Sequence, residues 1–162
     1  MIAYSDFRDA ALVLLDETFV GKPEGQDYTW IVEHEGGGLI DTLAALTANE
    51  ASHKPTTDTN SIASHVNHLR QALAWTNAVI RGEPTTGDWE ATWLVQTVDA
   101  ARWDELRADL EREYRELREH GAQSESRPDK ESMLGMMVVP AHALYHLGAI
   151  RQIMKSARAA KA

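Results

Sequence analysis

The sequence predicts an all-α protein: an up-and-down four-helix bundle with an extra short helix and long loops. Apolar residues recur at spacings of three and four along four long stretches, and no useful length of chain alternates apolar and polar residues as a β-strand does. With 162 residues, of which 43% are hydrophobic and 25% charged, the chain has the size and composition of one globular domain, assigned to residues 1–162.

The first helix is expected from Tyr4 to about Val20, where Gly21 ends the apolar repeat. Residues 24–38 show no sustained period and are expected to form a long ordered loop. Three consecutive glycines, 36–38, lie in this loop, but no Lys-Ser or Lys-Thr pair follows them and no strand pattern precedes them. A nucleotide-binding loop is therefore not expected here.

Two helical stretches follow this loop. A short segment runs from Leu39 to about Ala51, and a longer helix runs from about Asn60 to Arg81. A tryptophan-rich connection, residues 87–93, comes after the longer helix. These stretches supply the extra short helix and the second long helix of the expected bundle.

The second half of the chain predicts two more long helices. One runs from about Asp99 to His120, with Gly121 as its C-terminal stop. The other covers about residues 130–157 and contains Pro140. Either the last helix begins near this proline or a longer helix is kinked there, and the sequence leaves both alternatives open.

Two histidines four residues apart, His142 and His146, lie within the apolar repeat of the last helix. This spacing places both on the face that carries Ile150 and Ile153, so both imidazoles are expected to point into the core. A divalent transition metal would use two inward nitrogens together. Hydrogen bonds to backbone carbonyls or to Tyr145 are the alternative, and the spacing alone does not choose between them.

The composition limits both the metal chemistry and the partners. The chain has no cysteine, so a metal ion would be held by nitrogen and oxygen ligands only. A net charge of −9 disfavours nucleic acid and anionic membranes, and no apolar run approaches the ~18 residues that span a bilayer. The first residues lack the pattern of a secretory signal, so the expected location is the cytoplasm.

Two segments resemble the DinB superfamily, the DinB/YfiT-like metalloenzymes. Residues 59–69 resemble the family's first ligand helix, with His68 at the ligand position, and residues 141–150 resemble its closing His-x-x-x-His-x-Gly-x-Ile motif. The resemblance follows the helix order along nearly the whole chain, but specific residues match only in these two segments. It implies a four-helix bundle that holds one metal ion with His68, His142 and His146.

The motif departs from the family at one place, and the ligand set is open at another. Many members carry Arg-Gly-Gln after the second motif histidine, whereas this chain has Leu147-Gly148-Ala149, which places it in a different branch, and the resemblance does not identify its particular substrate. His65 lies one turn before His68 and is either a rival ligand or a group that orients one. The sequence does not distinguish zinc, nickel, iron and manganese, because imidazole ligands suit several of these metals.

The resemblance implies a metal-dependent enzyme that acts on a small molecule. Some DinB relatives are thiol-dependent S-transferases or isomerases, so the expected reaction is transfer of a low-molecular-weight thiol to an electrophile. One alternative is a metal-dependent hydrolase, and another is a non-catalytic dimeric helical module that binds metal or a small ligand. We also expect a homodimer.

No general base is identified in the sequence. The loop carboxylates Glu33 and Glu35 are expected to be solvated rather than to act as a ligand or a base. His34, His53 and His120 fall in loops or at a helix end, so they are left out of the expected site.

Overall fold

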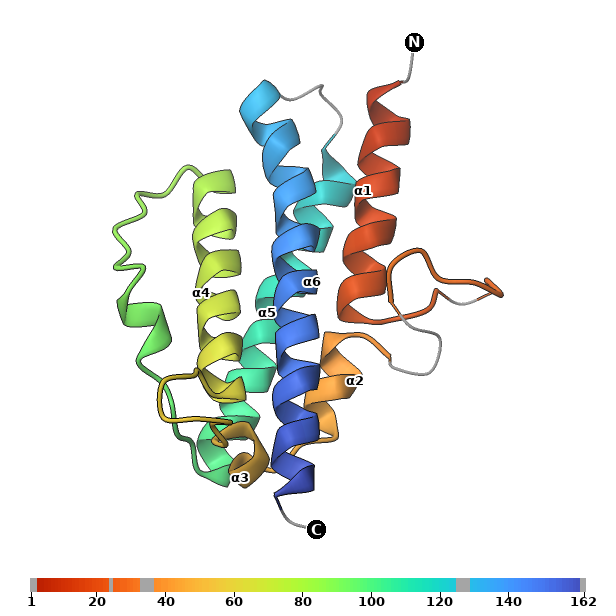
Figure 1. Ribbon diagram of the computed structural model, residues 1–162. Helices are drawn as coiled ribbons and strands as arrows, with labels where there is room; N and C mark the ends of the chain where they lie inside the picture. Colours follow the sequence, from red (N-terminus) through yellow and green to blue (C-terminus); the bar gives the residue numbers. More distant parts are fainter. Residues whose placement is uncertain (1–2, 24, 33–36, 125–128, 161–162) are drawn as a thin grey trace.

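A computed structural model describes residues 3–23, 25–32, 37–124 and 129–160 of the chain. Its regular structure within these ranges is helical, with no strand, which confirms the predicted all-α class (Figure 1). The four long helices are α1 (Tyr4–Phe19), α4 (Ile62–Ile80), α5 (Ala100–Gln123) and α6 (Lys130–Ala159). The short elements are α2 (Leu39–Ala44), α3 (Ala48–Ala51) and the 3₁₀ helix η1 (Ala91–Trp93).

The long helices pack as a bundle around a shared apolar core. Helices α1 and α4 each pack against both α5 and α6, so every long helix has two long neighbours. Each helix turns its apolar stripe inward because burial of this surface is the main favourable contribution to folding. The buried side chains include Phe19 of α1, Leu69 of α4, Leu106 of α5 and Ile150 of α6.

The up-and-down order expected from the sequence is wrong for one pair of helices. Helices α4 and α5 run in the same direction, and the connection between them, residues 81–99, returns along the length of the bundle (Figure 1). Two contacts show the parallel register: the Asn77 amide donates to the Glu113 carbonyl at 3.0 Å, and Arg81, directly after the end of α4, pairs with Glu116 one turn further along α5. This returning connection carries η1 past α4.

The end of α1 requires glycine at two positions. Gly21 has a φ of 103°, and a Cβ there would lie 2.8 Å from the Gly38 nitrogen. A Cβ on Gly38 would lie 2.4 Å from the Phe19 backbone. These contacts let the chain that enters α2 pass directly against the end of α1, and Gly21 ends α1 as predicted.

Three helix boundaries differ from the sequence predictions. Helix α5 continues through Gly121 to Gln123, because this glycine packs closely against α1 instead of ending the helix: a Cβ there would lie 2.9 Å from Leu12. The segment 39–51 forms two helices, since Thr47 caps α3 by accepting from the Glu50 backbone N–H at 3.3 Å. Helix α6 runs continuously through Pro140, so the last helix does not begin there.

Helix α6 meets the length and composition criteria for crossing a membrane, with a mean hydropathy of 1.4 in its most apolar 18-residue window. Unbroken apolar runs in the sequence did not predict this property. The signal is weak, since a core helix of a bundle passes the same test. Helix α6 buries Ala143, Leu147 and Ile150 in the core and exposes Leu134 and Tyr145.

Candidate metal centre

Four histidines meet where α4 and α6 pack against each other. The two helices run antiparallel, so His65 lies opposite His146 and His68 lies opposite His142. The spacings of three residues on α4 and four on α6 keep each pair on the inward face of its helix. His68 and His146 are each 1% exposed, whereas His142 is only half-buried.

The three histidines implied by the family resemblance lie close enough to hold one metal ion. The Nε2 atom of His142 is 3.3 Å from Nε2 of His68 and 2.9 Å from Nε2 of His146. Ligand nitrogens of all three residues lie within 4.8 Å of one another. Two nitrogens that each lie about 2.05 Å from a zinc ion are about 2.9 Å apart at a ligand angle of 90° and about 3.4 Å apart at 110°. The spacing therefore fits a shared divalent ion.

The ring orientation of His68 is fixed by Thr92, a residue of η1. The Thr92 hydroxyl donates to the Trp89 carbonyl at 2.6 Å, which uses its only proton. Its oxygen lies 2.7 Å from Nδ1 of His68, so this nitrogen must carry a proton and donate to Thr92. The lone pair of His68 is therefore on Nε2, the atom that faces His142.

His65 contacts a neighbouring histidine instead of the point where the other rings converge. Its Nδ1 lies 2.8 Å from Nδ1 of His146, so one of these two nitrogens donates to the other. When His146 is the donor, its Nε2 keeps a free lone pair directed at the cluster. Of the two roles that the sequence left open for His65, the geometry fits a group that orients a ligand.

Hydrogen bonds alone do not satisfy the three converging nitrogens. Nε2 of His68 carries no proton, and neither does Nε2 of His146 when that ring donates through Nδ1 to His65. The proton that His142 can carry on Nε2 then reaches only one of the other two atoms. A divalent cation would accept a lone pair from each ring, so the donor set fits a metal ion better than it fits protons.

Burial keeps these imidazoles in the neutral form that binds metals. Removal from water lowers the pKa of His65 and His68 to about 4, and the neighbouring histidines lower the pKa of His68 further. Burial and the adjacent imidazoles lower the pKa of His146 to about 3. Burial also lowers the pKa of His142. At neutral pH the cluster therefore presents uncharged rings, as ligation requires.

Two tryptophans of the returning connection enclose the cluster. The ring of Trp93 stacks on His68 at 3.9 Å between centroids, and Trp89 meets the same imidazole edge-on at 4.4 Å. The connection is held on α4 by the Asn67 amide, which donates to the Thr92 carbonyl at 2.7 Å, and by the Ser64 hydroxyl, which donates to the Trp93 carbonyl at 2.9 Å. The tryptophan-rich connection is evident in the sequence, but the contacts of Thr92 and Trp93 with the site were not predicted from it.

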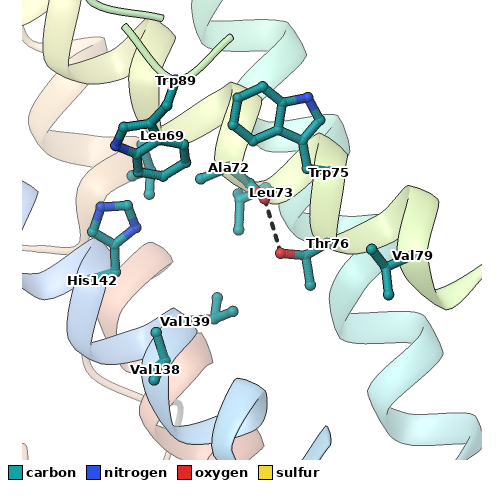
Figure 2. Close-up of a pocket in the computed structure, with 10 residues that line it drawn as sticks. All are labelled: Leu69, Ala72, Leu73, Trp75, Thr76, Val79, Trp89, Val138, Val139 and His142. Atoms are coloured by element: carbon teal, nitrogen blue, oxygen red, sulfur yellow. Dashed lines mark hydrogen bonds between the residues drawn. The ribbon is translucent and has the colours of Figure 1, made fainter. Parts of the chain in front are cut away.

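A pocket of about 290 Å³ opens beside His142 (Figure 2). Helix α4 forms one wall, with Leu69, Leu73 and Val79 among its side chains, and α6 forms another with Val138 and Val139. Trp75 of α4 and Trp89 of the connection complete the lining. The candidate metal centre therefore adjoins a space that can hold a small molecule.

The other histidines that the structure describes lie apart from this site, as the sequence analysis expected. His53 lies 3.3 Å from the Ser156 hydroxyl, and His120 lies 3.5 Å from a carboxylate oxygen of Glu116. His34, Glu33 and Glu35 lie outside the described residues.

Comparison with known proteins identifies no family for the chain. No family model matches it, and no curated protein or solved structure matches it significantly. The structural support for a function is therefore the geometry of the histidine cluster and of the pocket.

Proposed function

We propose that the chain is a metal-dependent enzyme of the DinB type, in which His68, His142 and His146 hold one divalent ion, such as zinc, nickel or iron. The observation that carries this proposal is the approach of three imidazole nitrogens, at 2.9 Å and 3.3 Å, beside an open pocket. The donor set is neutral and nitrogen-only, which suits these transition metals and not magnesium or calcium.

The number of ligands favours a catalytic site over a structural one. Structural zinc sites are closed by four protein ligands, whereas catalytic sites use three and leave a position for water or substrate. His142, the half-buried member of the cluster, lines the pocket, so a small molecule in the pocket could reach an ion held by the three histidines. When bound, a divalent ion supplies Lewis acidity, which lowers the pKa of a coordinated thiol or water toward neutrality.

The chain's own residues prepare this site before any substrate arrives. Thr92 and His65 hold the rings of His68 and His146 in one orientation, so less reorganisation is needed on ligation. The indole of Trp93 covers His68 and keeps water from that side of the cluster. An apolar surround of this kind strengthens electrostatic interactions inside the site.

The leading reaction is transfer of a low-molecular-weight thiol to a small-molecule electrophile. In such a transfer the thiol releases its proton to solvent water, sulfur forms a bond to an electrophilic carbon, and the leaving group departs with the electrons of the broken bond. Hydrolysis follows the same course with water in place of the thiol. The sequence resemblance is the support for thiol transfer, and the pocket beside His142 supports a small-molecule substrate for either reaction.

One observation favours a non-catalytic module as the second candidate. No aspartate or glutamate is among the described residues that line the pocket, so the site presents no carboxylate base for a proton transfer. A protein that only binds a metal ion and a small ligand would need no such base. Turnover assays on metal-loaded protein separate the two candidates.

The test is the metal content of untagged protein, measured by elemental analysis on wild type, His68→Ala, His146→Ala and the control His53→Ala. We expect about one metal ion per chain in wild type and in the control, and none in the two cluster variants. The loaded wild type would then be assayed for thiol transfer and for hydrolysis. No bound metal in wild type after incubation with zinc, nickel or iron(II) would overturn the proposal.

A further inference from the structure

We infer that the pocket beside His142 binds the uncharged, flat aromatic part of the substrate, with the reacting atom at its His142 end. The inference deepens the proposed function and rests on it for the identity of the ligand as a substrate. The pocket runs from His142 at one end to Val79 at the other, between α4 and α6 (Figure 2). A molecule that fills it extends away from the histidine cluster along these two helices.

The pocket lining excludes a charged ligand group. Apart from Thr76 and His142, the described lining residues are aliphatic or aromatic, and none is an aspartate, glutamate, lysine or arginine. An ionised group placed here would lose part of its hydration without gaining a partner of opposite charge. The polar part of a substrate must therefore lie at the His142 end or outside the pocket.

Thr76 adds little to polar recognition. Its hydroxyl donates to the Ala72 carbonyl one turn earlier on α4, at 2.9 Å, which uses its only proton (Figure 2). The Thr76 side chain therefore presents its methyl group and an oxygen that can only accept, and no free donor. Recognition along this wall depends on apolar contact.

The size of the pocket sets the size of the ligand group. A dry apolar cavity of about 150 Å³ is large enough to hold benzene. A volume of about 290 Å³ therefore accepts a group close to two fused rings. Smaller aliphatic groups would leave part of the apolar lining without contacts, which weakens binding.

The shape of the lining favours flat rings. The ring centroids of Trp75 and Trp89 lie 5.4 Å apart, with an interplanar angle of 34°. The Trp89 ring also faces the His142 ring, with centroids 6.2 Å apart and an interplanar angle of 25°. Gly87 packs directly on Trp75, since a Cβ at that position would lie 1.9 Å from the indole. This close approach holds the two indoles as a continuous aromatic wall, and aromatic ligands stack favourably on such a wall.

The probes for the test are 2-naphthol and two relatives that each change one property. 2-Naphthoate adds a negative charge, and decahydro-2-naphthol keeps the carbon skeleton but removes the aromatic rings. Binding is measured by calorimetry on metal-free protein, because a carboxylate could otherwise bind the metal ion. We expect 2-naphthol to bind the tightest, with affinity lower by about threefold or more for the saturated analogue and about tenfold or more for the anion.

Two variants locate the binding site, and a third controls for the substitution. Ala72→Phe fills the pocket from α4, and Val138→Phe does so from a half-exposed position on α6 where a larger side chain is more easily accommodated. Ala108→Phe places the same ring on the exposed face of α5. We expect 2-naphthol affinity to fall at least about tenfold in the two pocket variants and to stay at the wild-type value in the control.

The outcomes separate this inference from the proposed function. The inference is overturned if 2-naphthol binds equally well to wild type and to folded pocket variants. It is also overturned if the anion or the saturated analogue binds as tightly as 2-naphthol. In either case the metal content of wild type still tests the proposed function. Pocket-specific binding of 2-naphthol to a chain that takes up no metal upholds the ligand class and overturns the enzyme proposal.

Discussion

The Nδ1 atom of His68 lies 2.7 Å from the Thr92 hydroxyl, which joins a candidate metal ligand of α4 to the connection that returns along the bundle. This hydrogen bond leaves the lone pair of His68 on Nε2, toward His142. The returning connection therefore has a chemical role in addition to linking two parallel helices, because it selects the tautomer of a ligand.

Replacing Thr92 with valine should weaken metal binding without abolishing it. The substitution keeps the shape of the side chain but removes the hydroxyl that orients His68, and loss of such a partner costs about 10- to 100-fold in metal affinity. Thr92→Ser keeps a hydroxyl and should restore most of the affinity. Competition with a chromophoric chelator measures both variants, and equal affinity of wild type and Thr92→Val would contradict the assigned role.

His65 and His68 should behave differently when each is replaced by alanine. His68→Ala removes a ligand nitrogen, so the metal content should fall to near zero. His65→Ala removes only the partner of His146 Nδ1, so the protein should retain about one metal ion at an affinity lower by about 10- to 100-fold. Metal content after dialysis against a weak chelator distinguishes the two variants. The reverse pattern would identify His65 as the ligand.

The sequence predicted the long helices well because each carries an apolar stripe that must be buried. An amphipathic stripe has the same period in either direction, so it could not show that α4 and α5 run parallel. Gly121 was read as a helix stop from local preference, but its place against Leu12 is set by tertiary packing.

The histidines of the candidate site could be found by spacing and by motif resemblance, since they repeat within single helices. Thr92 could not be found in this way. Its contact with His68 joins positions 24 residues apart in sequence, and it depends on how the connection folds back. The apolar pocket was missed for the same reason, because its walls come from two helices and the connection.

The metal-free protein should lose stability as the pH falls from about 6.5 to about 4. Burial lowers the pKa of His65 and His68 to about 4 in the folded state, whereas an unfolded chain binds protons on these residues near their ordinary value of 6.5. Between these values the unfolded state binds more protons, so the free energy of unfolding decreases with decreasing pH.

Urea unfolding of metal-free protein at several pH values measures this dependence. Above about pH 8 these two imidazoles are neutral in both states and should add no slope. His65→Phe removes one of the titrating groups, so its stability should depend less steeply on pH than that of wild type. Identical slopes in the two proteins would show that His65 is not buried in its neutral form.

Alanine at Gly148 should stabilise the protein, whereas alanine at Gly38 should destabilise it. Gly148 lies within α6, and a Cβ there would have no neighbour within 4 Å, so the gain in helix propensity should add about 0.5–1 kcal/mol to the free energy of unfolding. A Cβ on Gly38 would lie 2.4 Å from the Phe19 backbone, so the end of α1 must move, at a cost of about 1–3 kcal/mol. Chemical denaturation measures both changes.

Metal content should be unchanged in Gly148→Ala, because the position is exposed and needs no glycine for packing within the chain. A loss of metal in this variant would show that the glycine of the His-x-x-x-His-x-Gly-x-Ile pattern acts on the site itself.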